Sequence, residues 1–167
     1  MQKTGPLPLQ APDAERFPNA DRREPALGSP AAVGPRSGGR QRILLTGEDA
    51  AQRLMIRRRL EADGYEVATC ETGRETVLAL LQGSADLLLV NAPLRDCSAA
   101  ALLRWTRSRR ASTHMTCMVM VSANDTQIVA GLYDAGADFV ITRRTELDLL
   151  PRKVAAALAR RPLALAS

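Results

Sequence analysis

The amino-acid sequence predicts an α/β domain in which helices cover both faces of a parallel sheet. Short aliphatic runs alternate five times with segments of helical periodicity over roughly 120 residues, a pattern typical of a doubly wound fold. Several of these runs are continuously apolar, as expected for strands that are buried on both faces. Because aromatic residues make up only 3% of the 167 residues, we expect the core to consist of aliphatic side chains.

The first part of the predicted domain contains three strands and two helices. In its first helix, Gln52, Met55, Ile56 and Leu60 recur at helical spacing and are expected to form one inward-facing stripe. Gly64 should end this helix, because glycine readily adopts the left-handed conformation found at helix C-termini. The predicted elements are strands 42–46, 65–70 and 86–90 and helices 50–63 and 74–82.

The second part contains three helices and two strands. Gly136 separates the second of these helices from the last strand. Pro151 falls in the first turn of the final helix, where a missing backbone N–H costs little. The predicted elements are helices 98–109, 126–135 and 148–160 and strands 117–121 and 138–142.

Polar residues follow four of the five predicted strands. In doubly wound sheets, ligands bind outside the carboxyl ends of the strands, which meet at one edge of the sheet. We therefore expect the side chains at these positions to converge in one crevice. The residues at these strand ends are Gly47, Glu48 and Asp49 after the first strand, Asn91 after the third, Ser122 after the fourth and Arg143 after the fifth.

Proline and glycine concentrate ahead of the domain. Residues 1–40 hold seven of the ten prolines and five of the eleven glycines, with almost no apolar periodicity. Such a segment buries too little apolar surface to offset the entropy lost on ordering, so we expect a disordered tail. The predicted domain then spans 41–161, and 162–167 form a short C-terminal tail.

The composition excludes several classes of protein. The chain lacks any run near the ~20 apolar residues that a membrane span requires. Its formal charge of +5 comes from dispersed arginines, so we do not expect nucleic-acid binding. The three cysteines are scattered without metal-ligand spacing, which argues against a zinc site and favours a reducing, cytoplasmic location.

Four segments together resemble the receiver domain of bacterial response regulators. They are ILLTGED, DLLLVN, VMVSAND and DAGADFVITRR, and the resemblance runs from Arg42 to about Arg161. It implies a flavodoxin-like, doubly wound sheet of five parallel strands in the order 2-1-3-4-5, flanked by five helices. It also implies a place in two-component phosphorelay signalling, where an aspartate receives a phosphoryl group beside a bound Mg²⁺.

The residues at the implied phosphoacceptor pocket depart from the family pattern. The resemblance places the acidic pair on Gly47 and Glu48, the phosphoacceptor on Asn91, the hydroxyl on Ser122 and the lysine on Arg143. An amide carries no charge and cannot form an acyl phosphate. Mg²⁺ prefers hard anionic oxygens, of which few remain. We therefore expect a degenerate pocket with weak or absent Mg²⁺ binding, no other cofactor, no metal site and no catalytic residue.

Two arrangements of the pocket are open at this stage. Asn91 could form a satisfied polar pair with Ser122, or it could contact Arg143 without a metal. Arg143 and Arg144, expected in a loop after the fifth strand, could also bind a small anion or a nucleotide, because guanidinium groups suit phosphate.

A partner surface is implied by the family's usual interface, which the fourth helix, fifth strand and last helix form. Tyr133, Val140 and Arg144 fall on it. Val140 takes the place of the family's switching aromatic residue, and the neighbouring Phe139 should point to the opposite face of the sheet.

The sequence therefore favours a stand-alone degenerate receiver that acts without phosphorylation as a protein-binding adaptor, and not as an enzyme. Its expected partners are a histidine kinase, a phosphotransferase or another signalling protein. One alternative is an effector that binds a cyclic dinucleotide through Arg143 and Arg144. The other is a phosphorylatable single-domain response regulator, with Asp96 as its acceptor.

Overall fold

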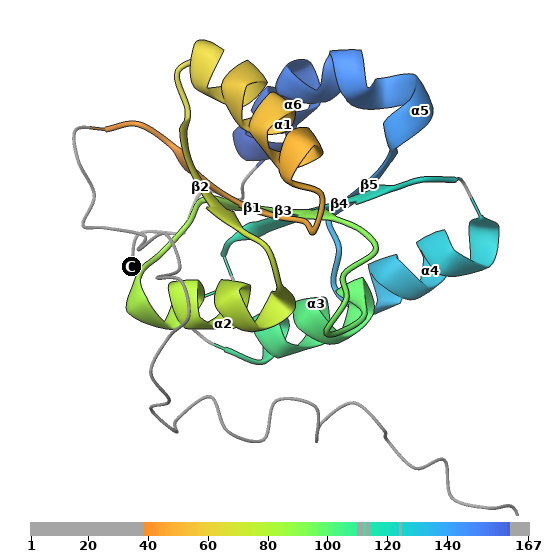
Figure 1. Ribbon diagram of the computed structural model, residues 1–167. Helices are drawn as coiled ribbons and strands as arrows, with labels where there is room; N and C mark the ends of the chain where they lie inside the picture. The colour runs from red at the N-terminus through yellow and green to blue at the C-terminus, as the bar shows by residue number, and fades with distance from the viewer. Residues whose placement is uncertain (1–38, 110–111, 113, 124, 161–167) are drawn as a thin grey trace, which may run out of the picture.

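Five parallel strands form a single sheet in the order β2-β1-β3-β4-β5 (Figure 1). The structure, a computed structural model, describes residues 39–160 except 110, 111, 113 and 124. The predicted tails, 1–40 and 162–167, lie almost entirely outside this range. The strands are β1 (Arg42–Thr46), β2 (Glu66–Cys70), β3 (Leu87–Asn91), β4 (Thr116–Val121) and β5 (Phe139–Thr142).

Helices cover both faces of the sheet, which confirms the predicted doubly wound fold. In Figure 1, α1 and α6 lie on one face, and α2, α3 and α4 lie on the other. The helices are α1 (Ala50–Ala62), α2 (Gly73–Gln82), α3 (Ala99–Ser108), α4 (Thr126–Asp134) and α6 (Leu150–Ala159). Between β5 and α6 the chain forms a four-residue helix, α5 (Arg143–Glu146), and a 3₁₀ segment, η2 (Leu147–Leu149).

The core consists of two aliphatic layers, one on each face of the sheet. Successive residues of a strand point to opposite faces, so Leu44 packs in the α2–α4 layer while Ile43 and Leu45 pack in the α1–α6 layer. The same alternation places Val140 against the first layer and Phe139 against the second, as predicted. All six residues of β4 and all five of β3 are buried, in agreement with their continuous apolar sequence.

Short polar side chains begin the helices directly after the strands. Asp49 accepts a hydrogen bond from the backbone N–H of Gln52, 2.9 Å away, and so caps α1. Ser98 caps α3 and Asp125 caps α4 in the same way. The carboxylate of Asp49, one of the polar groups at the edge of the sheet, is therefore engaged by its own helix.

The structure differs from the sequence-based prediction at two places. Met55, expected in the inward stripe of α1, is 37% exposed, whereas Ile56 and Leu60 are buried. The segment expected to be a loop after β5 is helical, and the final helix starts at Leu150 and not at 148. Arg143 and Arg144 are therefore the first residues of α5 and do not lie in a loop.

Candidate functional site

Asn91 lies at the carboxyl end of β3, beside Gly47, and is only 3% exposed. A Cβ atom added at Gly47 would lie 3.0 Å from the Cβ of Asn91 and 3.3 Å from its Nδ2. The absence of a side chain at position 47 thus allows β1 and the Asn91 side chain to approach closely. Replacing the expected carboxylate by glycine changes the shape of the crevice as well as its charge.

Both ends of the Asn91 amide group are hydrogen-bonded. Its Nδ2 donates to Oε1 of Gln52 in α1 at 3.1 Å. Its Oδ1 accepts a hydrogen bond from the guanidinium of Arg143 in α5. The same guanidinium nitrogen donates to the carbonyl oxygen of Ala92 at 2.7 Å. Of the two arrangements that the sequence left open, the structure has the contact between Asn91 and Arg143, and Arg143 binds both the Asn91 side chain and the following backbone.

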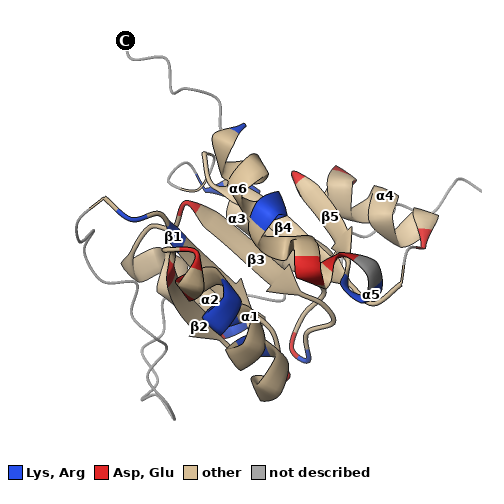
Figure 2. Cartoon of the chain, turned by 90° about the horizontal axis from the view of Figure 1, so that it is seen from above, with Lys and Arg blue, Asp and Glu red and all other residues tan. Residues whose placement is uncertain are grey.

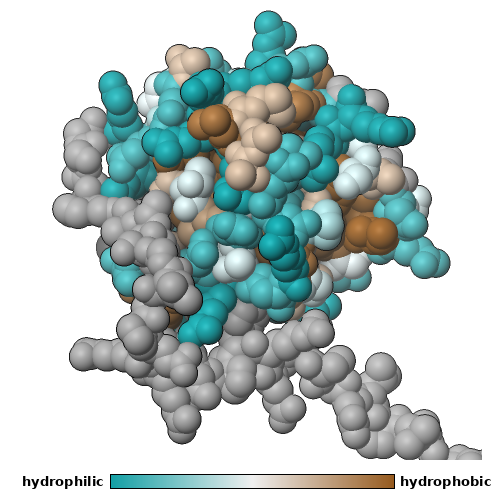
Figure 3. Space-filling model, viewed as in Figure 1, coloured by the Kyte–Doolittle hydropathy of each residue, from teal (hydrophilic) through white to brown (hydrophobic). Residues whose placement is uncertain are grey.

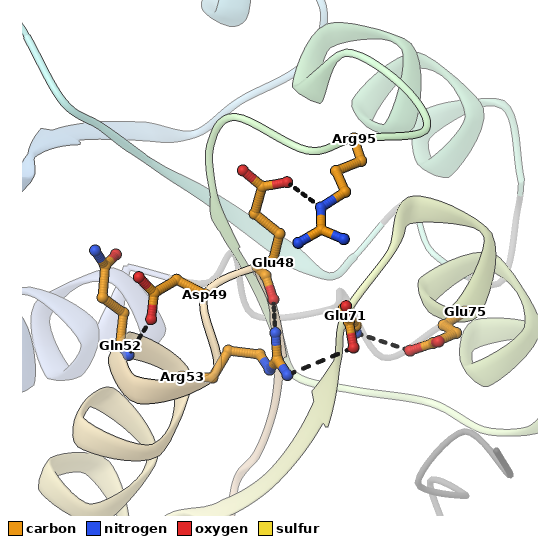
Figure 4. Close-up of polar contacts among 8 residues, drawn as sticks. Glu48, Asp49, Gln52, Arg53, Glu71, Glu75 and Arg95 are labelled. Carbon is orange, nitrogen blue, oxygen red and sulfur yellow. Dashed lines mark hydrogen bonds and ion pairs between the residues drawn. The ribbon is translucent and has the colours of Figure 1, made fainter.

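Two further arginines bind oxygen atoms at the mouth of the crevice (Figure 4). Arg95, from the segment after β3, makes a 3.0 Å ion pair with Glu48. Arg53, from α1, donates to the carbonyl oxygen of Gly47 and lies 3.8 Å from the carboxylate of Glu71. We call Gly47, Glu48 and Asn91, with these two arginines and Arg143, the arginine crevice.

The arginine crevice supplies positive charge from the protein itself. A guanidinium group has five N–H donors, no acceptor and a permanent charge, so it can satisfy oxygen atoms but cannot ligate a cation. Here three such groups reach oxygens of Gly47, Glu48 and Asn91. Within the described part of the chain, His, Cys, Asp and Glu side chains do not gather in any group of three that could hold a metal ion.

Ser122 does not share in this hydrogen bonding as the sequence suggested it could. It directly follows β4 and is exposed. The described hydrogen bonds of the Asn91 side chain go to Gln52 and Arg143 instead. The polar pair that fills the pocket is therefore Asn91 with Arg143.

Arg144 is exposed, while the guanidinium of its neighbour Arg143 turns inward to Asn91 and Ala92. The consecutive arginines thus face different surroundings. On the predicted partner surface, Tyr133 is 46% exposed, and its hydroxyl accepts a 3.2 Å hydrogen bond from the backbone N–H of Val140. This contact ties α4 to β5.

Asp96, which follows Arg95 in the sequence, binds the backbone at the start of α2. Its two carboxylate oxygens accept hydrogen bonds from the backbone N–H groups of Gly73 and Arg74 at 2.9 and 2.8 Å. These are the first residues of α2, where the helix dipole also favours a negative charge. Asp96 therefore joins the segment after β3 to the start of α2.

Sequence reasoning did not single out Gln52, Arg53 or Arg95 as residues of the site. Gln52 and Arg53 lie in the first turn of α1, and Arg95 lies four residues after Asn91. The sequence feature that could have identified them is their position within a few residues of the carboxyl ends of β1 and β3. The choice of partner for each of the 21 arginines depends on side-chain geometry, which periodicity does not encode.

Glu146 holds α5, and therefore Arg143, in place. Its carboxylate accepts hydrogen bonds from Nζ of Lys153 at 2.5 Å and from the backbone N–H of Thr142 at 2.7 Å. The hydrogen bond from Lys153 is the main cause that lowers the pKa of Glu146 below its ordinary value of 4.5, and the one from Thr142 adds to it. The charged form of Glu146 thus stabilises the folded chain.

We expect this carboxylate to contribute to acid unfolding. Because the pKa of Glu146 is lower in the folded than in the unfolded chain, its stabilisation is present above the unfolded pKa. That stabilisation is lost as the pH falls through the folded pKa. Urea unfolding from about pH 6 to about pH 3 should show a smaller loss of stability in Glu146→Gln than in the parent chain. Lys153→Met should reduce the loss similarly, and identical pH slopes in all three chains would contradict this role.

Charged residues of both signs are distributed along the described part of the chain. In the view of Figure 2, basic and acidic segments are interspersed along the ribbon. None of the helices in the described ranges is both long and apolar enough to cross a bilayer.

Comparisons with known proteins agree with this architecture. The family described as the response regulator receiver domain matches residues 43–155. The phosphate regulon transcriptional regulatory protein PhoB of Rhizobium meliloti is 28% identical over 113 residues, which are 66% of this chain and 49% of that protein. The chain thus spans about half the length of this curated relative.

Solved structures show the same fold. A receiver domain of a signal transduction histidine kinase from Syntrophus aciditrophicus superposes with a TM-score of 0.68 at 22% identity, covering 76% of this chain and 96% of that one. A CheY-like receiver domain protein from Methanospirillum hungatei gives 0.68 at 24% identity, covering 74% and 97%. With strand order 2-1-3-4-5, a crevice at the carboxyl ends of β1 and β3, and a family match over most of its length, the chain belongs to the response regulator receiver domains of two-component systems.

Proposed function

We propose that this receiver domain acts in two-component signalling as an adaptor that binds a protein partner without being phosphorylated. The observation that carries the proposal is the hydrogen-bonded position of Asn91 between Gln52 and Arg143. A phosphoacceptor must present an ionised carboxylate to the phosphorus atom. Asn91 presents an amide, and both ends of that amide are already engaged.

The electrostatics of the arginine crevice support the same conclusion. Phosphoryl transfer depends on bound cations that neutralise the charge developing on the phosphoryl oxygens. Here Arg95 pairs with Glu48, and Arg53 takes the Gly47 carbonyl. A Mg²⁺ ion entering the crevice would have to displace these guanidinium groups and then lie among positive charges. We therefore propose that Mg²⁺ binding is weak or absent and that the chain has no catalytic activity of its own.

The proposed partner is a histidine kinase, a phosphotransferase or another signalling protein in the cytoplasm. Tyr133 and Arg144 are exposed beside β5, and they would contact the partner together with Val140. The location in a reducing compartment is supported by the three cysteines, which are scattered along the sequence and all buried.

The two alternatives receive less support from the contacts. A phosphorylatable receiver that uses Asp96 would first have to release this carboxylate from the start of α2. An effector that binds a cyclic dinucleotide through Arg143 and Arg144 would need both side chains to contact the same ligand. Arg143 is instead bound to Asn91 and Ala92, away from its exposed neighbour.

The direct test is incubation of the chain with acetyl phosphate and Mg²⁺, followed by mass spectrometry of the intact protein. We expect no phosphoryl adduct, because no carboxylate in the crevice is placed as a nucleophile. An adduct that disappears in Asp96→Asn would establish the phosphorylatable alternative. An adduct that persists in that variant would also contradict the proposal and would require mapping of another acceptor.

A further inference from the structure

Residues 93–97, which we call the strap, connect β3 to α3 beside the mouth of the arginine crevice. The described backbone–backbone hydrogen bonds stop at Ala92, whose N–H donates to the carbonyl oxygen of Met120 at 2.9 Å, and resume at Ser98. The strap itself lies between the end of β3 and the start of α3, outside the helices and strands. Its attachment to the domain therefore depends on side chains. Segments of this kind can open locally while the core stays folded.

Asp96 attaches the strap to the start of α2. Its Oδ1 accepts a hydrogen bond from the N–H of Gly73 at 2.9 Å, and its Oδ2 accepts one from the N–H of Arg74 at 2.8 Å. Hydrogen bonds to a charged acceptor are stronger than neutral ones, and the amino end of a helix attracts a negative charge. Because Asp96 is exposed, water competes for both bonds. They can therefore be released without unfolding of α2.

Gly73 provides the space in which the strap packs against α2. A Cβ atom added at Gly73 would lie 2.3 Å from Sγ of Cys97, which is too close for two non-bonded atoms. The φ angle of Gly73 is not positive, so the packing of the strap, and not the backbone conformation, requires glycine here. In this position Leu94 is 9% and Cys97 6% exposed. Figure 3 shows a face on which hydrophobic residues form small patches among hydrophilic ones, and the attached strap likewise keeps these two side chains covered.

Arg95, the neighbour of Asp96, reaches from the strap to Glu48 (Figure 4). The ion pair is 3.0 Å long, and the side chains of Arg95 and Glu48 are 71% and 32% exposed. Exposed ion pairs contribute little to stability, so this contact alone holds the strap only weakly. The hydrogen bonds of Asp96 instead set the position from which Arg95 reaches Glu48. The charge of Glu48 is neutralised as long as the strap stays attached.

We propose that the strap opens as a unit while the sheet and helices stay folded, that Asp96 is its latch, and that opening releases Glu48 from Arg95. The latched strap is an autoinhibitory contact, because it keeps the Glu48 carboxylate from contacting other cationic groups. The open strap presents this carboxylate at the crevice and uncovers Cys97. The device controls which charges the arginine crevice presents, and it does not depend on whether the domain acts as an adaptor.

The thiol of Cys97 reports the opening. The full, folded chain is labelled with iodoacetamide at about pH 8, and mass spectrometry resolves the rate at each cysteine. Cys70 and Cys117 are 2% and 0% exposed, and burial raises the pKa of each thiol to about 12. Their labelling therefore follows unfolding of the core. We expect Cys97 to be labelled about tenfold faster or more, because local opening precedes global unfolding. Below the unfolding transition its rate should change little with urea, since local opening exposes little surface.

Two variants weaken the attachment of the strap at different points. Asp96→Asn removes the charge of the latch and should speed the labelling of Cys97 relative to Cys117 on the order of tenfold. Gly73→Ala should act in the same direction, because its Cβ atom would displace the Sγ of Cys97. The matched control is Gly131→Ala, also inside a helix and without positive φ, where an added Cβ atom meets nothing within 4 Å. It should leave the labelling of Cys97 unchanged.

Arg95→Gln separates the latch from the contact that the latch positions. It should speed the labelling of Cys97 by no more than about twofold, as expected for an exposed ion pair. In carbon NMR spectra, the side-chain carboxyl resonance of Glu48 in Asp96→Asn should move toward its position in Arg95→Gln. A Glu48 resonance that stays at its parent position in Asp96→Asn would overturn the proposal.

The ratio of Cys97 to Cys117 labelling corrects for any general loss of stability, because global unfolding exposes both thiols. The proposal is also overturned if Cys97 is labelled no faster than Cys117 in the parent chain. The same conclusion follows if Asp96→Asn and Gly73→Ala both leave the ratio unchanged.

Discussion

Asn91→Asp is expected to remain almost unlabelled by acetyl phosphate and Mg²⁺, although it restores an ionised carboxylate at the end of β3. The new carboxylate would form an ion pair with Arg143, and the carboxylate of Glu48 is itself held by Arg95. Position 47 would still lack a carboxylate for Mg²⁺. A nucleophile alone does not supply the charge stabilisation that phosphoryl transfer requires.

The matched comparison is the combined variant Gly47→Asp/Asn91→Asp/Arg143→Lys. It returns a second carboxylate beside residue 91 and replaces the guanidinium fork by an ammonium group. We expect the single variant to be labelled on the order of a hundredfold more slowly, because one preorganised charge contact is typically worth that much. Intact-mass time courses measure both rates. Because a side chain at position 47 comes close to residue 91, circular dichroism must first show that the combined variant is folded. Equal labelling of the single and the folded combined variant would then show that the charges around Asn91 do not control phosphorylation.

Arg143→Ala is expected to lower the free energy of unfolding by about 2 kcal/mol. The substitution removes the donor to Oδ1 of Asn91 and to the carbonyl oxygen of Ala92. Asn91 is 3% exposed in the parent chain, so its Oδ1 lies among protein atoms that include the Arg143 guanidinium. A buried acceptor left without a partner costs more than the net value of the hydrogen bond it loses. Urea unfolding monitored by circular dichroism measures the change.

The adjacent Arg144→Ala is the control for this experiment. Arg144 belongs to the same short helix and carries the same charge, but its side chain is exposed. Its removal should change the free energy of unfolding by less than about 0.5 kcal/mol, as is usual for surface substitutions. If the two alanine variants are equally stable, the inward contacts of Arg143 contribute nothing to the folded chain.

The fold could be predicted because its strongest signals are local and repeated. The aliphatic runs of β3 and β4 are long enough to identify buried strands, and the polar caps that follow the first four strands mark where a helix begins. Met55 was misplaced because it lies at the margin of the α1 stripe, where helical periodicity does not distinguish buried from exposed positions. Helix α5 was missed because it has four residues and no capping side chain at its N-cap, Thr142. Glu146 instead binds the Thr142 N–H and Lys153 of α6, a tertiary contact.

The position of the site could also be predicted, whereas its internal contacts could not. Parallel topology alone brings the residues after β1, β3 and β5 to one edge, and Asn91 and Arg143 do meet there. The alternative contact between Asn91 and Ser122 could not be rejected from the sequence, because Asn91 ends β3 and Ser122 follows β4, the strand beside it. The roles of Arg53 and Arg95 depend on how far long side chains reach across the crevice, and sequence spacing carries no such information.

The central claim is that guanidinium groups hold the oxygen atoms of the crevice, so that neither Mg²⁺ nor a phosphoryl group binds there. Titration of the isotopically labelled chain with Mg²⁺ and then with beryllofluoride, followed by backbone amide resonances, tests it most directly. We predict no saturable shift at Glu48, Asn91 or Ser122. Saturable shifts at these three residues that require both additions would contradict the claim.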